Sequence, residues 1–192
     1  NHLKDRKDTK VFADLQIHWG RKGLSNPAPD ISVIRGVKDP DKPRRSFFVR
    51  KEGVKPSFIL EVVSPRYRKS DVRDKPEIYR RAGVDEYVVV DPGPDEIPHV
   101  ERLREALGGA DSVVILVTHG HADHSGGAER LGRALAAEVR GFGPGARPFS
   151  PGESVFTDAG SLVPLLTPGH TRDHYAFHWP EARAVFPGDL IL

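Results

Sequence analysis

A histidine-rich string in the second half of the chain carries the clearest chemistry. Residues 118–124 read THGHADH, so His119, His121, Asp123 and His124 lie close together at the end of an apolar run. Because the chain contains no Cys, a metal site must use imidazole nitrogens and carboxylate oxygens, which suit zinc. The spacing lets His119 and His121 face one ion while Asp123 and His124 face a second. The string therefore predicts a metal-binding turn rather than a chance polar loop.

The segments around this string are expected to hold it rigidly. Residues 112–118 are almost continuously apolar, which predicts a strand inside an α/β sheet, and residues 128–135 have the spacing of an amphipathic helix. A turn between the two gives the fixed geometry that a metal site requires. Further strands are expected at residues 11–19, 30–34, 58–63, 86–90, 162–166, 175–179 and 184–186 and near residue 139, further helices at residues 74–82 and 97–107, and a long basic loop or hairpin at residues 36–56. The fold class is therefore α/β with mixed sheets.

The string and three other segments resemble the metallo-β-lactamase superfamily. Residues 167–171, TPGHT, are similar to its third motif, and Gly188-Asp189 is similar to its fourth. Residues 90–93, VDPG, are similar to the strand and Asp that precede its first helix. The resemblance covers about residues 87–192 and is nearest to the lactamase-like and glyoxalase-II-like hydrolases. It implies part of an αβ/βα half of that fold.

The resemblance also implies roles for particular side chains in metal-assisted hydrolysis by one or two zinc ions. Asp189 would bridge the two ions, and Asp123 would also orient the attacking water. Asp91 would support the turn without binding metal, and His174 and His178 would be structural or face the substrate. The implied metal ligands are His119, His121, Asp123, His124, His170 and Asp189.

The sequence departs from the superfamily in one respect that affects the metals. The fifth motif, which supplies the last His of the second metal, has no counterpart. The first metal keeps a full three-His set, whereas the second has Asp123, His124 and the bridging Asp189. We expect a lactamase-like region at residues 93–192 that lacks the C-terminal half of the domain.

Charge is distributed unevenly along the chain. Residues 1–92 hold 21 Lys and Arg against 14 Asp and Glu, whereas the remainder holds 8 against 13. All ten Lys lie at or before Lys75, and seven of the nine His follow residue 92. Such different usage is consistent with two origins joined in one chain, with a boundary at residue 92, and equally with an ordinary domain that has a lopsided surface.

Residues 10–92 resemble a second family, the Uma-type restriction endonucleases of the PD-(D/E)XK superfamily. The resemblance rests on residues 29–33, 58–65 and 75–87. It implies a partial mixed-sheet region in which Asp30 and Glu61 hold Mg²⁺. The nuclease pattern places a Lys two residues after the Glu, where this chain has Val63, so Lys75 would take its role. The alternative is that these carboxylates simply pair with the many basic side chains.

Three functions follow from these patterns. The first is a zinc hydrolase acting on a small ester, thioester or lactam-like substrate or on RNA. The second is a Mg²⁺-dependent DNA endonuclease, since the net basic charge of the first region suits a phosphate-bearing partner. The third is an inactive metal-binding fragment of a fusion. No apolar run approaches the roughly 20 residues of a membrane span, and a cytoplasmic location is expected.

Overall fold

Short apolar and β-branched runs build a six-stranded sheet. The computed structural model describes residues 8–62, 75–84, 86–157 and 160–190. The strand order is β1-β3-β5-β6-β7-β8. These strands are β1 (Lys10–Ala13), β3 (Ile31–Ile34), β5 (Pro56–Val62), β6 (Glu86–Val90), β7 (Ser112–Val117) and β8 (Glu138–Gly141). Strands β5 to β8 are parallel to one another, whereas β3 pairs antiparallel with both β1 and β5. The predicted α/β class with a mixed sheet is confirmed.

The large sheet runs without interruption across residue 92. Leu60 of β5 pairs with Val88 of β6, and Val88 pairs with Val114 of β7. Helices α2 (Lys75–Ala82) and α3 (Ile97–Leu107) lie along the chain between these parallel strands. Strands from both compositional regions therefore share one hydrogen-bonded sheet.

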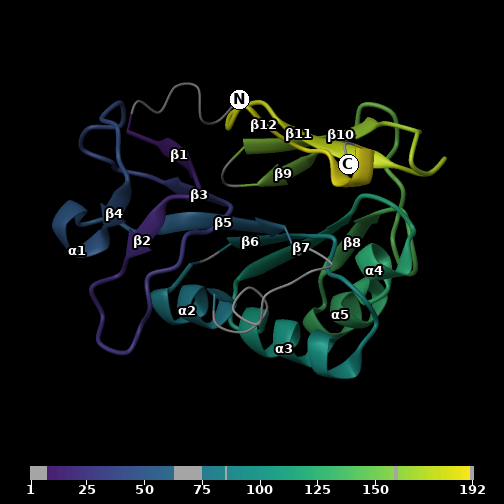
Figure 1. The fold of residues 1–192 in the computed structure, drawn as a ribbon, viewed down its shortest axis with the longest axis horizontal. Coiled ribbons are helices and arrows are strands. Elements are labelled where there is room, and N and C mark those ends of the chain that lie inside the picture. Colours follow the sequence, from purple (N-terminus) through teal and green to yellow (C-terminus); the bar gives the residue numbers. More distant parts are fainter. Residues whose placement is uncertain (1–7, 63–74, 85, 158–159, 191–192) are drawn as a thin grey trace.

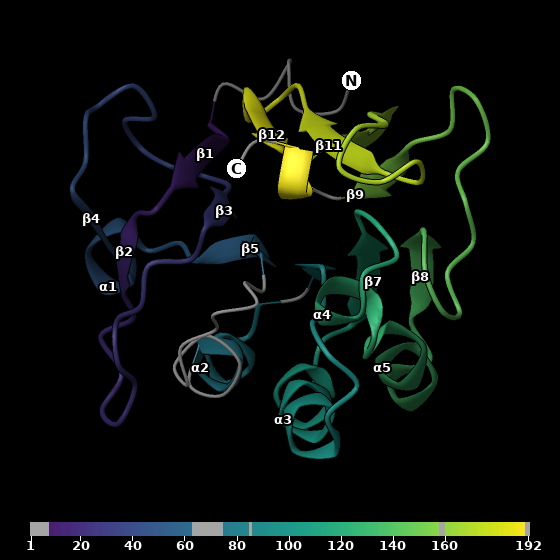
Figure 2. The same cartoon turned by 45° about the vertical axis from the view of Figure 1, so that its right-hand side comes forward.

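Alternate residues of the central strands face two different layers. Helices α2, α3 and α5 (Ala128–Leu135) cover one face of the large sheet, and a smaller sheet covers the other (Figure 1, Figure 2). Ile59 and Ile115 belong to the core on the helix side, together with Leu103 of α3 and other buried residues. Phe58 and Leu116 belong to the core on the opposite side. This alternation follows from the two-residue period of a strand.

The smaller sheet has four strands in the order β12-β11-β10-β9. They are β9 (Val155–Thr157), β10 (Gly160–Leu166), β11 (Tyr175–Trp179) and β12 (Ala184–Phe186), all antiparallel to their neighbours. Trp179 is fully buried, and its ring meets the ring of Phe58 edge-on at 5.2 Å. The smaller sheet is thereby packed on β5, a strand of the N-terminal compositional region (residues 1–92).

The expectations for the N-terminal third were partly wrong. The single strand expected at residues 11–19 is divided at Asp14, whose φ of 47° lies in the left-handed region, into β1 and β2 (Gln16–His18). Strand β2 pairs in parallel with β4 (Ser46–Phe48), which continues into α1 (Val49–Glu52) within the segment expected as a loop or hairpin.

The other expected helices and strands are found with small shifts, and β9 was not expected. Ile97, the first residue of the helix expected at residues 97–107, is 62% exposed although it is apolar. Asp74, the first residue of the helix expected at residues 74–82, and Val63 lie outside the described residues. Within the described ranges, no helix has the length and apolar content needed to cross a membrane.

Candidate metal centre

The histidine string occupies a turn from strand to helix, as its sequence predicts. Strand β7 ends at Val117, and helix α4 (Ala122–Ser125) begins directly after His121. Strand β6, parallel to β7, ends beside it and delivers Asp91 to the same edge. The carboxyl ends of parallel strands are where open α/β sheets place ligand sites.

A second loop is carried over this turn by main-chain pairing. The amide of Tyr175 donates to the carbonyl of Thr118 at 2.7 Å, and His119 forms an isolated antiparallel bridge with His174. These contacts pair the residues that follow β7 with the residues at the start of β11. The loop of residues 167–174 therefore folds back above the histidine turn. His170 is thereby brought to His119 although 51 positions separate them in the sequence.

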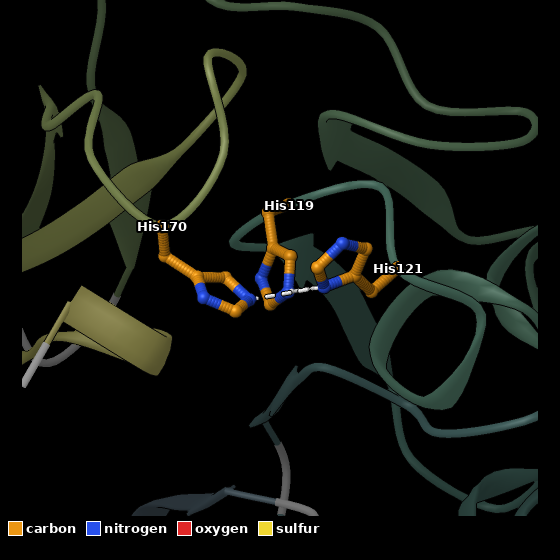
Figure 3. A group of neighbouring side chains, drawn as sticks. All are labelled: His119, His121 and His170. Carbon is orange, nitrogen blue, oxygen red and sulfur yellow. Dashed lines mark hydrogen bonds between the residues drawn. The ribbon is translucent and has the colours of Figure 1, made fainter. Parts of the chain in front are cut away.

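Three imidazole rings converge from the two loops (Figure 3). The Nδ1 atom of His121 lies 3.0 Å from Nε2 of His119 and 3.0 Å from Nε2 of His170. One unshared pair on His121 Nδ1 can satisfy only one such contact by hydrogen bonding. Ligands at about 2.0–2.1 Å in a tetrahedral zinc site would be about 3.3 Å apart, close to these separations. The donor set therefore fits a cation shared by the three rings.

A second group of potential ligands adjoins the first. Ring nitrogens of His119 and His124 and an oxygen of Asp189 all lie within 4.8 Å of one another. His124 Nε2 is buried, lies 3.4 Å from Asp189 Oδ2, and has no hydrogen-bond partner among the described residues. A buried nitrogen of this kind beside a carboxylate fits a metal ligand. Asp123 is more distant, with its Oδ2 3.9 Å from His124 Nε2 and its side chain 60% exposed.

Asp91 organises the turn from beneath. Its Oδ1 accepts the amide of Thr118 at 2.8 Å, and its Oδ2 accepts the Thr118 hydroxyl at 2.8 Å. The same Oδ2 lies 3.0 Å from His124 Nδ1, and the Thr118 hydroxyl lies 2.9 Å from His119 Nδ1. Asp91 thereby orients His124 directly and His119 through Thr118, the supporting position expected of it. Thr118 lies in the string, but sequence reasoning assigned it no role.

The pKa values of two rings, His119 and His124, are shifted in opposite directions. Burial, with smaller contributions from His124 and His121, lowers the pKa of His119 to about 4 although Asp91 and Asp189 act against it. Burial also acts to lower the pKa of His124, but the hydrogen bond and charge of Asp91 and the charge of Asp189 outweigh it and raise that pKa. His119 is therefore neutral near pH 7, the form that binds metal.

Gly188 allows Asp189 to approach the rings. Its φ is +54°, and a Cβ at this position would lie 2.8 Å from His174 Nε2 and 2.9 Å from Thr118 Cβ. Gly188 therefore packs directly against His174 and Thr118 at the start of the short helix η2 (Gly188–Leu190), which carries Asp189. The sequence marks Gly188 as part of a motif, but its left-handed φ is not visible there. His178 lies on β11 and belongs to neither group of ligands.

The residues expected for the nuclease lie on the same sheet. Asp30 directly precedes β3, and Glu61 lies near the end of β5. Ile31 pairs with Leu60, so the backbones of Asp30 and Glu61 adjoin at one end of the two strands. Lys75 is the first residue of α2. Their metal roles stay predictions.

Comparison with known families bears on both halves of the chain. Residues 1–110, more than half of the chain, match the family model of Uma2, described as "Putative restriction endonuclease". The chain belongs to the Uma2 family. Residues 78–160 also match the metallo-beta-lactamase superfamily. The two matches overlap from α2 through α3, and both resemblances seen in the sequence are confirmed.

Similar proteins cover the lactamase-like part. A hydroxyacylglutathione hydrolase of Cereibacter sphaeroides is 36% identical over 118 residues, 58% of this chain and 45% of that protein. A hydroxyacylglutathione hydrolase of Synechococcus sp. is 39% identical over 113 residues, 54% of this chain and 43% of that protein. A beta-lactamase-like protein 2 homolog of Caenorhabditis elegans is 31% identical over 119 residues, 55% of this chain and 40% of that protein. The chain thus spans less than half the length of these relatives.

Proposed function

We propose that the chain is a zinc-dependent hydrolase of the metallo-β-lactamase type. The observation that carries this proposal is the convergence of His119, His121 and His170 from two loops, with ring nitrogens 3.0 Å apart. His119, His121 and His170 would hold the first ion. His124 and Asp189 would hold a second, with Asp189 reaching toward both: its Oδ2 lies 3.7 Å from His170 Nε2.

Each side chain has a defined task in this proposal. When bound, zinc supplies a Lewis acid that polarises a scissile carbonyl and acidifies water near neutral pH. Asp123, exposed beside His124, would orient the attacking water and accept its proton. Asp91 and Thr118 hold the rings of His124 and His119 so that little reorganisation is needed on binding.

The substrate class we propose is a small thioester. Two of the similar proteins are named for hydrolysis of hydroxyacylglutathione, a thioester, and they match the part of the chain that contains the ring clusters. Esters, lactam-like compounds and RNA are the alternatives to compare in the same assay.

Zinc content and hydrolysis test the proposal together. Purified chain is expected to hold at least one zinc, measured by atomic emission, and His121→Ala is expected to lose it because a three-ligand site becomes a two-ligand site. His178→Ala is the matched control, since it removes a histidine outside both clusters. Zinc-free wild type, or equal zinc in His121→Ala, contradicts the proposal. Zinc binding without turnover of any of these substrates would favour the inactive metal-binding fragment.

We propose Mg²⁺-dependent DNA cleavage as a second candidate, which membership of the Uma2 family favours. Asp30 and Glu61 would hold the ion, and Lys75 would steady the attacking water. Nicking of DNA that requires Mg²⁺, is lost in Glu61→Ala and persists in His121→Ala would support it. Nicking that follows His121 instead would assign cleavage to the ring clusters.

A further inference from the structure

A fully buried histidine lies in the first turn of α3, outside both ring clusters. The Nε2 atom of His99 lies 2.6 Å from the carbonyl oxygen of Pro92. Because a carbonyl oxygen can only accept, Nε2 carries the proton and donates. Gly93 packs against the same ring, since a Cβ there would lie 2.8 Å from Nε2. The imidazole therefore fits closely under the peptide that joins Pro92 to Gly93.

This peptide belongs to the loop that makes hydrogen bonds with His124. The amide of Gly93 donates to the carbonyl of His124 at 3.0 Å, and the carbonyl of Gly93 accepts the amide of Gly127 at 2.8 Å. Two residues earlier, Asp91 holds the His124 ring through Nδ1. The loop of residues 91–93 thus fixes both the main chain and the ring of His124, and His99 supports the loop from the helix side.

The loop has a conformation that needs such support. Asp91 is a non-glycine residue with φ of +53°, in the left-handed region. A residue other than glycine keeps a left-handed φ only where its surroundings hold the backbone in that conformation. Asp91 supplies one set of contacts through its carboxylate, and the hydrogen bond from His99 fixes the next peptide along the chain.

We propose that His99 is a positioning residue for His124, which belongs to the second group of potential metal ligands. It holds the Pro92–Gly93 peptide, so that Asp91 keeps its left-handed backbone and its carboxylate stays on His124. This inference rests on the proposed function only in counting His124 as a ligand. No part of the sequence pattern indicated it, because His99 lies among the apolar positions of an amphipathic helix.

The test compares three variants of the full chain in two measurements. His99→Leu keeps bulk but removes the donor, whereas His99→Gln keeps an N–H at a similar reach. Leu103 lies in the same helix and is only 2% exposed, so Leu103→Ala is the control for a general loss of packing. The measurements are zinc affinity by competition with a chelator, and hydrogen exchange of the Thr118 and Gly127 amides without metal.

We expect His99→Leu to weaken zinc binding about tenfold or more, as loss of outer support does in metal sites. Exchange of the Thr118 and Gly127 amides is expected to quicken, because their acceptors are Asp91 Oδ1 and the Gly93 carbonyl. His99→Gln should restore both properties, and Leu103→Ala should leave zinc affinity near that of wild type. If His99→Leu does not fold, His99→Asn takes its place, since its shorter amide falls short of Pro92.

Two results would overturn the inference. One is wild-type affinity and exchange in the variant without the donor. The other is an equal loss in Leu103→Ala, which would make the role of His99 purely one of packing. Wild-type chain that binds no zinc would refute the proposed function, while the exchange measurement would still decide whether His99 holds the loop.

Discussion

The carboxylate of Asp91 contacts His124 directly and His119 through Thr118. Its replacement should therefore weaken metal binding without preventing the chain from folding. Asn has the same shape, but its amide group would present N–H protons where Asp91 Oδ2 accepts from Thr118 and contacts His124. We expect Asp91→Asn to weaken zinc binding about 10- to 100-fold. The measurement is a zinc titration against a chelator. Asp95→Asn, which removes only an exposed pair with Arg130, should bind zinc as wild type does; equal weakening in both would contradict this.

The lowered pKa of His119 makes the metal-free chain sensitive to acid. Below the ordinary value of 6.5 an unfolded chain binds a proton at this residue, whereas the folded chain does so only near pH 4. Stability is therefore fully present above about pH 6.5 and is lost as pH falls toward 4, by at most about 3 kcal/mol. His174, whose pKa burial also lowers, acts in the same direction, and His124, whose pKa is raised, opposes them.

Chemical denaturation of metal-free chain between pH 4 and 7 measures this slope. His119→Gln should flatten it, because the residue no longer titrates. A slope that is unchanged in this variant would show that other groups set the acid sensitivity.

The sequence predicted which imidazole rings come together better than it predicted most of the contacts that hold them. His119, His121 and His170 could be selected because their spacing and the surrounding motifs are unusual, and the structure brings their rings together. Contacts such as those of Thr118 and His99 depend on how loops distant in sequence meet, and a single hydroxyl or buried imidazole has no distinctive pattern. Asp123 illustrates the converse, since its place in the motif gave no indication that its side chain is 60% exposed.

Among the elements, the short helix η2 depends on one glycine. A Cβ at Gly188 would meet His174 and Thr118 at less than 3.0 Å and would also strain a left-handed backbone. Gly188→Ala is therefore expected to displace Asp189 and lower zinc affinity. Gly152→Ala is the matched control, because its φ is +78° but a Cβ there meets nothing within 4 Å. Equal zinc affinity in the two variants, measured by chelator competition, would contradict a positional role for Gly188.

Long periodic elements were predicted well, whereas several short ones were missed. Helix α3 and strand β7 have enough apolar positions to fix their type, so the structure agrees with the expected ranges. Strands β2 and β4 have three residues each, and their pairing joins residues 16–18 to 46–48 across a basic segment. Such short strands are stabilised by tertiary contacts rather than by their own pattern.

In the whole molecule, the packing of β5 on the smaller sheet couples the two family segments. Phe58 is fully buried and meets Trp179 edge-on. We expect Phe58→Ala to lower the free energy of unfolding by about 3–5 kcal/mol, since it leaves a cavity in a shared core. Denaturation followed by tryptophan fluorescence and by far-ultraviolet circular dichroism should give one coincident transition. Two separate transitions would instead support independent folding units on either side of residue 92, a boundary that stays a prediction of the sequence.

The parallel strands at the centre of the large sheet have a geometric consequence for ligands. Only β6 separates β5, which carries Glu61, from β7, which leads to His119. Neighbouring strands lie about 4.8 Å apart, so the carboxyl ends of β5 and β7 are about 10 Å apart on one rim. A nucleic acid duplex seated on one of these strand ends would overhang the other. Were the chain to have both proposed activities, DNA and a small thioester would compete for access, and each would inhibit the turnover of the other.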